Sequence, residues 1–473
     1  MKLITCLILV WSSTAYAVEP VETAKWKSYP EAEVLAQEGF IFAALDAQIR
    51  KLAAQSEKDS SDLEMLEDLV LKTNVEALED YDRQVLTGIP VATVHFLLGR
   101  EAWAQKKTTE ARSWLLSVPR WHRYYPEARL LLADMADPSD VLALEQQCIE
   151  SARKRADEVK SMLLKRYYTV LAEDCMTLAP RKHYKNGEYA EAMTGLSGIS
   201  KRSYKWPSLL LEKAWAAYNL KDYNRSLGLL VTYKSPLLSS YFYPEAEVLT
   251  ALSYFRLCLY DDALLVIDQY YTHYKPGSEA LESLLKSQRD SSDYFYKLMN
   301  LSPAEKAKVH PFVAQLAVQI SHRPRYALDQ ASLKRVEVEI SRMKTTVEGQ
   351  PKDVQKWMKA SMKQLEAVRT NLIGRINYHA KKDMFAFVSE VYMLSEEMFK
   401  VKLEIIARKK DLVYGQKDLI ANRGRGNFKQ VKKTRFEQFW KFQGAFWADE
   451  LGDYSFGLPS NCETVRKTEE AAQ

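Results

Sequence analysis

Glycine and proline are scarce in this sequence. Each contributes 16 of the 473 residues, whereas an average chain holds about 7% glycine and about 5% proline. Tight β-hairpin turns depend on such residues, so their shortage argues against a hairpin-rich β protein. We expect an all-α fold in which long helices are joined by few connections.

No charge of one sign dominates the chain. Lys and Arg number 67 against 62 Asp and Glu, which leaves a net charge of +5. Such a small excess gives no strong field for nucleic acid or anionic lipid. After residue 17 no apolar run approaches the ~18 residues of a transmembrane helix, so none is expected. With 47% hydrophobic residues, a chain of this length should form more than one module, because single cores stop growing at roughly 250–300 residues.

Signatures of catalysis and metal binding are also missing. The sequence holds no GxxxxGK[ST], HExxH, CxxC or GxSxG motif, and no GxGxxG after a strand. Its seven histidines include no pair three or four residues apart, the spacing that places two metal ligands on one helix face. We therefore predict a protein that is not an enzyme and that uses neither a cofactor nor a metal.

The first 17 residues have the pattern of a secretory signal peptide. Lys2 precedes an apolar stretch over residues 3–11, and Ala15 and Ala17 form a small-x-small cleavage site. The stretch is too short to span a bilayer, and Cys6 has too few apolar residues before it to be a lipoprotein site. The pattern predicts cleavage after Ala17 and export, with the periplasm as the expected compartment.

Four cysteines remain after this cleavage, and they allow three pairings if all are oxidised. The sequence favours none of them. No glycine or proline marks a turn between Cys148 and Cys175, and one straight helix would hold these two residues about 40 Å apart. Cys258 lies between two leucines and is expected to be a buried free thiol.

The region from about residue 96 to 276 repeats itself. The pairs Trp206-Pro207 and Tyr243-Pro244 each precede a helical pattern and lie 37 residues apart. Further residues match at the same offset: Ala214 with Ala251, Tyr218 with Phe255, Tyr223 with Tyr260, Ser226 with Ala263, and Leu230 with Ile267. Several matches at one offset indicate duplicated pairs of helices that stack on their neighbours, with the small residues allowing close helix approach.

This pattern resembles the tetratricopeptide-repeat family. Residues 187–192 (Gly-Glu-Tyr-Ala-Glu-Ala) are similar to the start of the second helix of such a repeat, as are residues 222–226 and 260–263. A weaker copy has Gly99, Ala102 and Ala111, with Thr108 in place of the aromatic residue. The resemblance covers under half of the chain. It departs from the family in its period of 37 rather than about 34 residues, and Pro180 should interrupt the helix before Gly187.

The resemblance implies a concave groove, lined by first helices, that binds a peptide or a helix of another protein. Aromatic and arginine side chains are suited to such a role, although each of them could instead pack between neighbouring helices. The family's inward-facing positions select Phe96, Arg100, Trp103, Trp215, Tyr218, Asn219, Leu252, Phe255 and Arg256.

Long helices are predicted between residues 327 and 422. Apolar residues alternate three and four apart in three series, over residues 333–347, 354–372 and 391–405. This spacing keeps one apolar seam on each helix and is typical of antiparallel hairpins or a coiled coil, through which copies could associate. Residues 349–351 (Gly-Gln-Pro) predict a break between helices, and Gly374 predicts a weaker one.

The C-terminal segment is rich in aromatic residues. Eight fall within about 20 residues, at positions 436, 439, 440, 442, 446, 447, 454 and 456. They should either fold back onto the helices or dock another protein. Residues 440–454 and Cys462 also resemble the ends of uncharacterised exported repeat proteins of predatory and gliding bacteria.

Six parts follow from these patterns: a signal peptide (1–17), a helical cap (18–90), tetratricopeptide-like repeats (91–276), connecting helices (277–326), long heptad-patterned helices (327–422), and a linker with the aromatic segment (423–473). The predicted function is an exported scaffold for protein–protein interaction, with a cell-envelope assembly as its expected setting. The alternative is an envelope enzyme that acts on cell-wall polymer, which export and size alone suggest.

Overall fold

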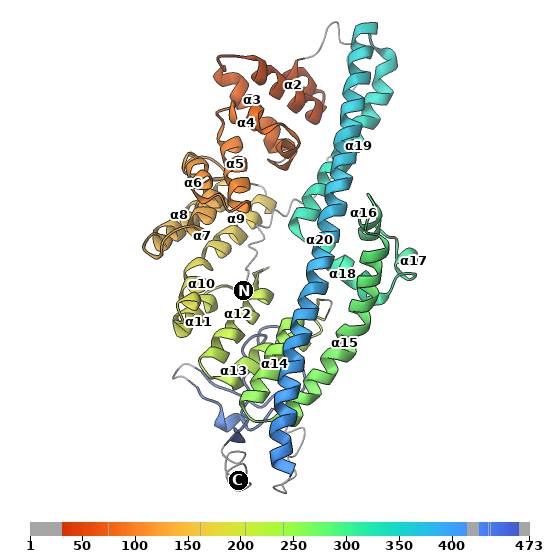
Figure 1. The fold of residues 1–473 in the computed structure, drawn as a ribbon. Helices are drawn as coiled ribbons and strands as arrows, with labels where there is room; N and C mark the ends of the chain where they lie inside the picture. Colours follow the sequence, from red (N-terminus) through yellow and green to blue (C-terminus); the bar gives the residue numbers. More distant parts are fainter. Residues whose placement is uncertain are drawn as a thin grey trace. The chain divides into compact units, whose positions relative to one another are not determined.

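The computed structural model describes residues 31–413 and 425–462, apart from positions 74, 161, 204, 240, 434 and 436. In this part of the chain the regular elements are α-helices and short 3-10 helices, with no β-strand (Figure 1). The predicted all-α fold is thus confirmed for the described residues. The predicted signal peptide lies outside them.

The helices form two compact units. Unit 1 holds the described residues up to Leu178, together with 292–296 and 321–379. Unit 2 holds residues 179–291 and 297–320 and the described residues from Ala380 onward. No helix in the described part of the chain is long and apolar enough to cross a membrane.

In unit 1, successive helices pack against each other in pairs, such as α1 on α2, α5 on α6 and α8 on α9. The helices of its N-terminal part are α1 (Ala32–Gln37), α2 (Ile41–Ala54), α3 (Ser60–Thr73), α4 (Arg83–Thr87), α5 (Ala92–Ala104), α6 (Thr108–Leu116), α7 (Tyr125–Asp134), α8 (Pro138–Glu158) and α9 (Met162–Cys175), with a 3-10 helix at Val75–Asp80 between α3 and α4.

The chain between Cys148 and Cys175 does turn, although no glycine or proline marks the place. Helix α8 ends at Glu158, and Val159 takes an extended conformation. Helix α9 then packs back on α8, and the two cysteines form a disulfide with their Cα atoms 5.9 Å apart. The helix thus ends without the glycine or proline that a sequence pattern would need to reveal the turn.

In unit 2, the helices continue as a series of hairpins up to α15. They are α10 (Leu178–Lys185), α11 (Tyr189–Ser197), α12 (Trp206–Asn219), α13 (Tyr223–Val231), α14 (Pro244–Arg256) and α15 (Tyr260–Ser287). The predicted 37-residue repeat corresponds to the hairpins α12–α13 and α14–α15. The small residues at its helix crossings, Ala214, Ser226, Ala251 and Ala263, are fully buried as expected.

Four hairpin turns share one backbone device. The second residue before each second helix has a positive φ: 62° at Lys106, 84° at Gly187, 60° at Lys221 and 57° at Cys258. In each turn the next N–H donates to the carbonyl oxygen five residues earlier, at 2.9 to 3.0 Å. This bond satisfies a carbonyl at the end of the first helix. The weak copy at α5–α6 is therefore built like the clean ones.

Two prolines lie within helices, and the position of Pro180 differs from the sequence expectation. Pro180 is in the first turn of α10, where the missing N–H is tolerated, so it does not interrupt that helix. Pro276 lies inside α15, which continues to Ser287. Beyond α15 come the short helices α16 (Tyr294–Met299), α17 (Pro303–Lys306) and α18 (Pro311–Ser321), and α17 begins with a capping box formed by Ser302 and Glu305.

The predicted long helices are α19 (Pro324–Thr346) and α20 (Lys352–Val413), separated at residues 349–351 as expected. In unit 1 they form an antiparallel hairpin, with Arg369 of α20 bonded to Glu337 of α19 at 3.0 Å. In unit 2 the second half of α20 packs on α15, where Lys402 pairs with Asp268 at 2.9 Å. The break predicted at Gly374 is wrong, because α20 runs through it; one glycine lowers helix stability by only ~1 kcal/mol.

Candidate partner-binding surface

Four of the predicted binding residues lie together on α12 and α14 of unit 2. Trp215, Tyr218 and Asn219 are half-buried and Arg256 is exposed. Arg256 Nε donates to the Tyr218 hydroxyl at 3.0 Å, and the Trp215 and Tyr218 rings meet edge to face with centroids 5.7 Å apart. We call these four residues the aromatic row.

Neighbouring hairpins hold the aromatic row in place. Asn219 Nδ2 donates to the hydroxyl of Tyr184 on α10 at 2.9 Å. Trp215 Nε1 donates to Glu245 Oε1 on α14 at 2.8 Å. Since the side chains are fixed before any partner arrives, little rotamer entropy would be lost on binding.

The other two predicted residues of α14 contribute less to an open surface. Phe255 is buried at 8% exposure, and the Arg408 guanidinium of α20 lies 5.4 Å from its ring centroid. Leu252 is half-buried. For Phe255 the packing alternative therefore describes its surroundings better than the groove.

The three predicted residues of α5 lie in unit 1. Phe96 is buried and stacks on Tyr124, with ring centroids 4.5 Å apart. Arg100 is held in ion pairs. Trp103 is half-buried, and its Nε1 donates to Asp134 at 3.0 Å. Phe96 and Arg100 thus make contacts within unit 1. Partner binding by the nine predicted residues stays a prediction.

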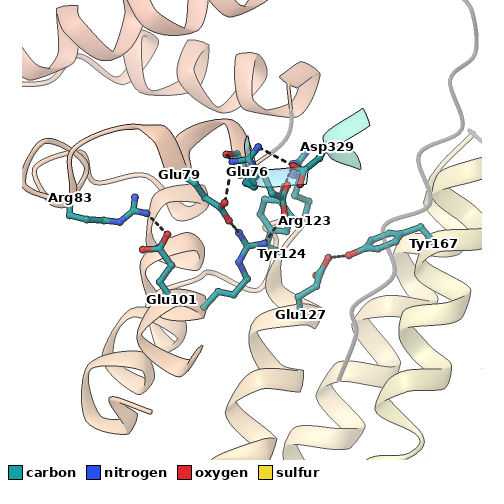
Figure 2. Close-up of polar contacts among 11 residues, drawn as sticks. Glu76, Glu79, Arg83, Glu101, Arg123, Tyr124, Glu127, Tyr167 and Asp329 are labelled. Carbon is teal, nitrogen blue, oxygen red and sulfur yellow. Dashed lines mark hydrogen bonds and ion pairs between the residues drawn. The ribbon is translucent and has the colours of Figure 1, made fainter. Parts of the chain in front are cut away.

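The ion pairs of Arg100 belong to a polar network in unit 1 that the sequence reading missed (Figure 2). Arg100 donates to Glu76 at 2.8 Å and to Glu79 at 2.9 Å. Arg375 of α20 pairs with Glu79 at 3.2 Å and with Asp329 of α19 at 3.0 Å. Two guanidinium groups thereby join the 3-10 helix Val75–Asp80 to α5, α19 and α20. The available signal was the spacing of Glu76 and Glu79, three residues apart among apolar neighbours.

A second part of the network surrounds Glu127 of α7 (Figure 2). The Tyr167 hydroxyl of α9 donates to its carboxylate, and Glu127 is 2% exposed. Burial raises the pKa of Glu127 from 4.5 to about 7, although the bond from Tyr167 opposes that rise. Burial likewise raises the pKa of the adjacent Tyr124 to about 12.

The raised pKa of Glu127 predicts a pH-dependent stability. Between pH 4.5 and 7 the folded state binds a proton that the unfolded state releases, so this stabilisation is complete below pH 4.5 and is lost as pH rises through about 7. We expect the free energy of unfolding of the wild-type protein to fall by an amount on the order of 2–3 kcal/mol between pH 5 and pH 8. In the Glu127→Gln variant this decrease should be absent. Urea unfolding of both proteins at the two pH values measures it. A variant with the wild-type pH dependence would contradict the prediction.

The C-terminal segment, residues 425–462, packs on the hairpins of unit 2, and we call it the C-terminal strap. The side-chain amide of Asn224 on α13 makes two hydrogen bonds with the backbone of Leu458. Asn224 Oδ1 accepts from Leu458 N–H at 2.9 Å, and Asn224 Nδ2 donates to the Leu458 carbonyl at 3.0 Å. Phe456 N–H donates to the Asn224 carbonyl at 3.0 Å. Phe456 and Leu458 are buried, so this end of the strap is part of the fold.

A disulfide and ion pairs fix the C-terminal strap further. Cys462 bonds to Cys258 in the turn between α14 and α15, with Cα atoms 5.1 Å apart, so the free thiol expected at Cys258 is wrong. Glu437 pairs with Arg225 of α13 at 3.0 Å. Of the aromatic residues, Phe442, Phe446 and Tyr454 form a cluster, whereas Trp440 and Trp447 are 77% and 61% exposed.

The C-terminal strap and the aromatic row use different sides of α12. A hollow of about 2130 Å³ beneath the strap is lined by Trp206, Lys213 and Leu220 of α12, among others. At 3.6 residues per turn these positions lie opposite Trp215 and Tyr218. The strap therefore covers one side of the repeat and leaves the aromatic row open.

The chain matches no protein-family model, and no curated protein matches it. Within the described ranges, no group of three or more His, Cys, Asp or Glu residues is placed to hold a metal ion. The two disulfides indicate an oxidising, extracytoplasmic environment. Fold and site thus define an all-α protein of packed helical hairpins, stabilised by disulfides.

Proposed function

We propose that this protein is an exported scaffold that binds another protein through the aromatic row. The observation that carries the proposal is the row itself: two aromatic side chains, an amide and an arginine, half-buried or exposed and already fixed by hydrogen bonds. Aromatic and arginine side chains dominate the binding energy of protein interfaces. The expected partner is a peptide or a helix, and the expected compartment is the periplasm.

The arrangement of unit 2 supports this role. The stacked hairpins supply a rigid frame, and the disulfide-bonded C-terminal strap closes the other side of α12 with residues of the same chain. Hydrophobic surface is thereby removed from one side of the repeat while the aromatic row stays accessible. A protein with one covered and one open side suits the binding of one partner at a time.

Site-specific photo-crosslinking tests the proposal. A photoreactive amino acid at Asn219 should capture a discrete protein in cells, and one at Leu265, which is 52% exposed on α15, should not. Trp215→Ala with Arg256→Ala should reduce the Asn219 product at least about tenfold, as for hot-spot residues worth ~1.4 kcal/mol or more. Circular dichroism checks the fold of the variant. Equal capture by the variant, or equal products at both positions, would count against the aromatic row.

A further inference from the structure

Helix α20 carries a second apolar series in unit 2, on a largely exposed face where the Tyr392 hydroxyl donates to Glu282 of α15 at 2.6 Å. Phe385, Tyr392, Phe399 and Ile406 follow each other at intervals of seven residues. Their exposed fractions are 62%, 42%, 54% and 51%. Met393 and Leu403 beside them are 63% and 50% exposed. We call these six residues the outer stripe.

The outer stripe is distinct from the seam that α20 uses inside unit 2. Met384, Val391, Met398 and Ile405 each precede a stripe residue by one position, and all are buried. One position corresponds to 100° around a helix, so the two series point in different directions. The same segment of helix therefore carries two heptad series, and the fold buries only the one that begins at Met384, which we call the inner seam.

A strict interval of seven specifies the kind of partner. Single exposed apolar residues are ordinary on protein surfaces, but a heptad series keeps one seam facing a neighbouring helix that winds around it. The outer stripe extends from Phe385 to Ile406, or about 31 Å of helix. A helix with the same interval is the complementary partner, and this chain supplies one.

We propose that the outer stripe pairs with the outer stripe of a second copy of this chain, forming an antiparallel two-helix interface. Each stripe residue would bury about 100 Å², since large aromatic side chains bury 150–250 Å² in full. The total of roughly 1,200 Å² over both copies reaches the lower end of stable protein interfaces. A two-fold axis relates the two copies, as in most dimers.

Charge decides the antiparallel direction. Glu396 and Lys382 lie on the same side of α20 as the outer stripe, four residues from Tyr392 and three from Phe385. Parallel copies would place each of these charges beside its own counterpart, which is destabilising. In the antiparallel arrangement Phe385 meets Leu403 of the second copy, and Tyr392 lies near its Glu396.

The oligomeric state of the full chain in solution tests the proposal. Analytical ultracentrifugation between about 1 and 50 µM should show a dimer, and Phe385→Lys with Phe399→Lys should weaken dimerisation at least ~100-fold. The matched control is Leu142→Lys on α8, which is 64% exposed and should leave the dimer intact. Circular dichroism establishes that each variant is folded. A wild-type monomer at the highest concentration, or an unchanged dimer in the double variant, would overturn the proposal.

Single cysteine variants test the direction. Antiparallel pairing places position 392 within about 6 Å along the axis of its counterpart, but separates the two copies of position 406 by about 36 Å. A bifunctional thiol crosslinker of about 10 Å should therefore join Tyr392→Cys to its counterpart, since the offset is too large for a direct disulfide, and should not join Ile406→Cys. A covalent dimer from Ile406→Cys alone would overturn the antiparallel arrangement. Neither experiment involves the aromatic row, so its outcome is independent of the proposed function.

Discussion

Replacing Gly228 by alanine is expected to detach the C-terminal strap from α13. A Cβ atom at Gly228 would lie 1.9 Å from the carbonyl oxygen of Tyr454 and 2.5 Å from the Cα of Ser455. Both are backbone atoms of the strap, so no side-chain rotation relieves the clash. Helix propensity alone would predict a gain of about 1 kcal/mol for this change. Because of the clash with the strap, we expect the variant to be less stable than the wild type instead.

Hydrogen exchange of strap amides measures the effect. The N–H groups of Phe456 and Leu458 donate to Asn224, and in the variant their protection should fall at least tenfold, or ~1.4 kcal/mol. The disulfide between Cys258 and Cys462 should still tether the detached strap. Gly374→Ala is the matched control, because nothing lies within 4 Å of its Cβ position; it should stabilise α20 by ~0.5–1 kcal/mol. Unchanged protection in Gly228→Ala would show that the strap is not packed as described.

Replacing Arg100 by methionine is expected to destabilise unit 1 by about 3–5 kcal/mol, the range for breaking a buried ion pair. The change removes the guanidinium group that binds Glu76 and Glu79, whose side chains are only 6% and 18% exposed. The two carboxylates would lose this cation in a site that water reaches poorly, and Glu79 would retain its pair with Arg375. Urea unfolding at pH 7 measures the free energy of unfolding.

Arg83→Met provides the control within the same network (Figure 2). Arg83 pairs with Glu101, but its side chain is 41% exposed, so this pair should be worth at most ~1 kcal/mol. Combining Arg100→Met with Glu76→Met should recover part of the loss, since two apolar groups replace a buried charge pair at little cost. Equal losses for Arg83→Met and Arg100→Met would mean that the Arg100 pairs are screened by water.

The residues of the aromatic row could be selected from the sequence, whereas those of the outer stripe were not. The 37-residue offset and the family resemblance selected Trp215, Tyr218, Asn219 and Arg256, and the structure brings these four together. The same positional rule selected Phe96 and Arg100, which lie in the interior of unit 1. A repeat position fixes which way a side chain leaves its helix. It does not fix whether another segment, here Tyr124 or the 3-10 helix Val75–Asp80, covers that side chain.

The outer stripe was present in the sequence but hidden by the inner seam. Val391, Met398 and Ile405 match a heptad, and so do Tyr392, Phe399 and Ile406 one position later. Periodicity alone cannot say which series faces the rest of the protein. The structure decides it, because Val391, Met398 and Ile405 are buried whereas Tyr392, Phe399 and Ile406 are exposed.

By itself, the sequence determined the local features of this protein. Shortage of glycine and proline, helical spacing of apolar residues and recurring small residues are properties of neighbouring positions, and they correctly predicted helices, hairpins and the break at residues 349–351. The tertiary structure alone decided what depends on residues far apart in the chain: the pairing of Cys258 with Cys462, the strap held by Asn224, and the charges gathered around Arg100. These contacts join segments up to 299 residues apart. The local sequence around a residue does not indicate which distant segment will pack against it.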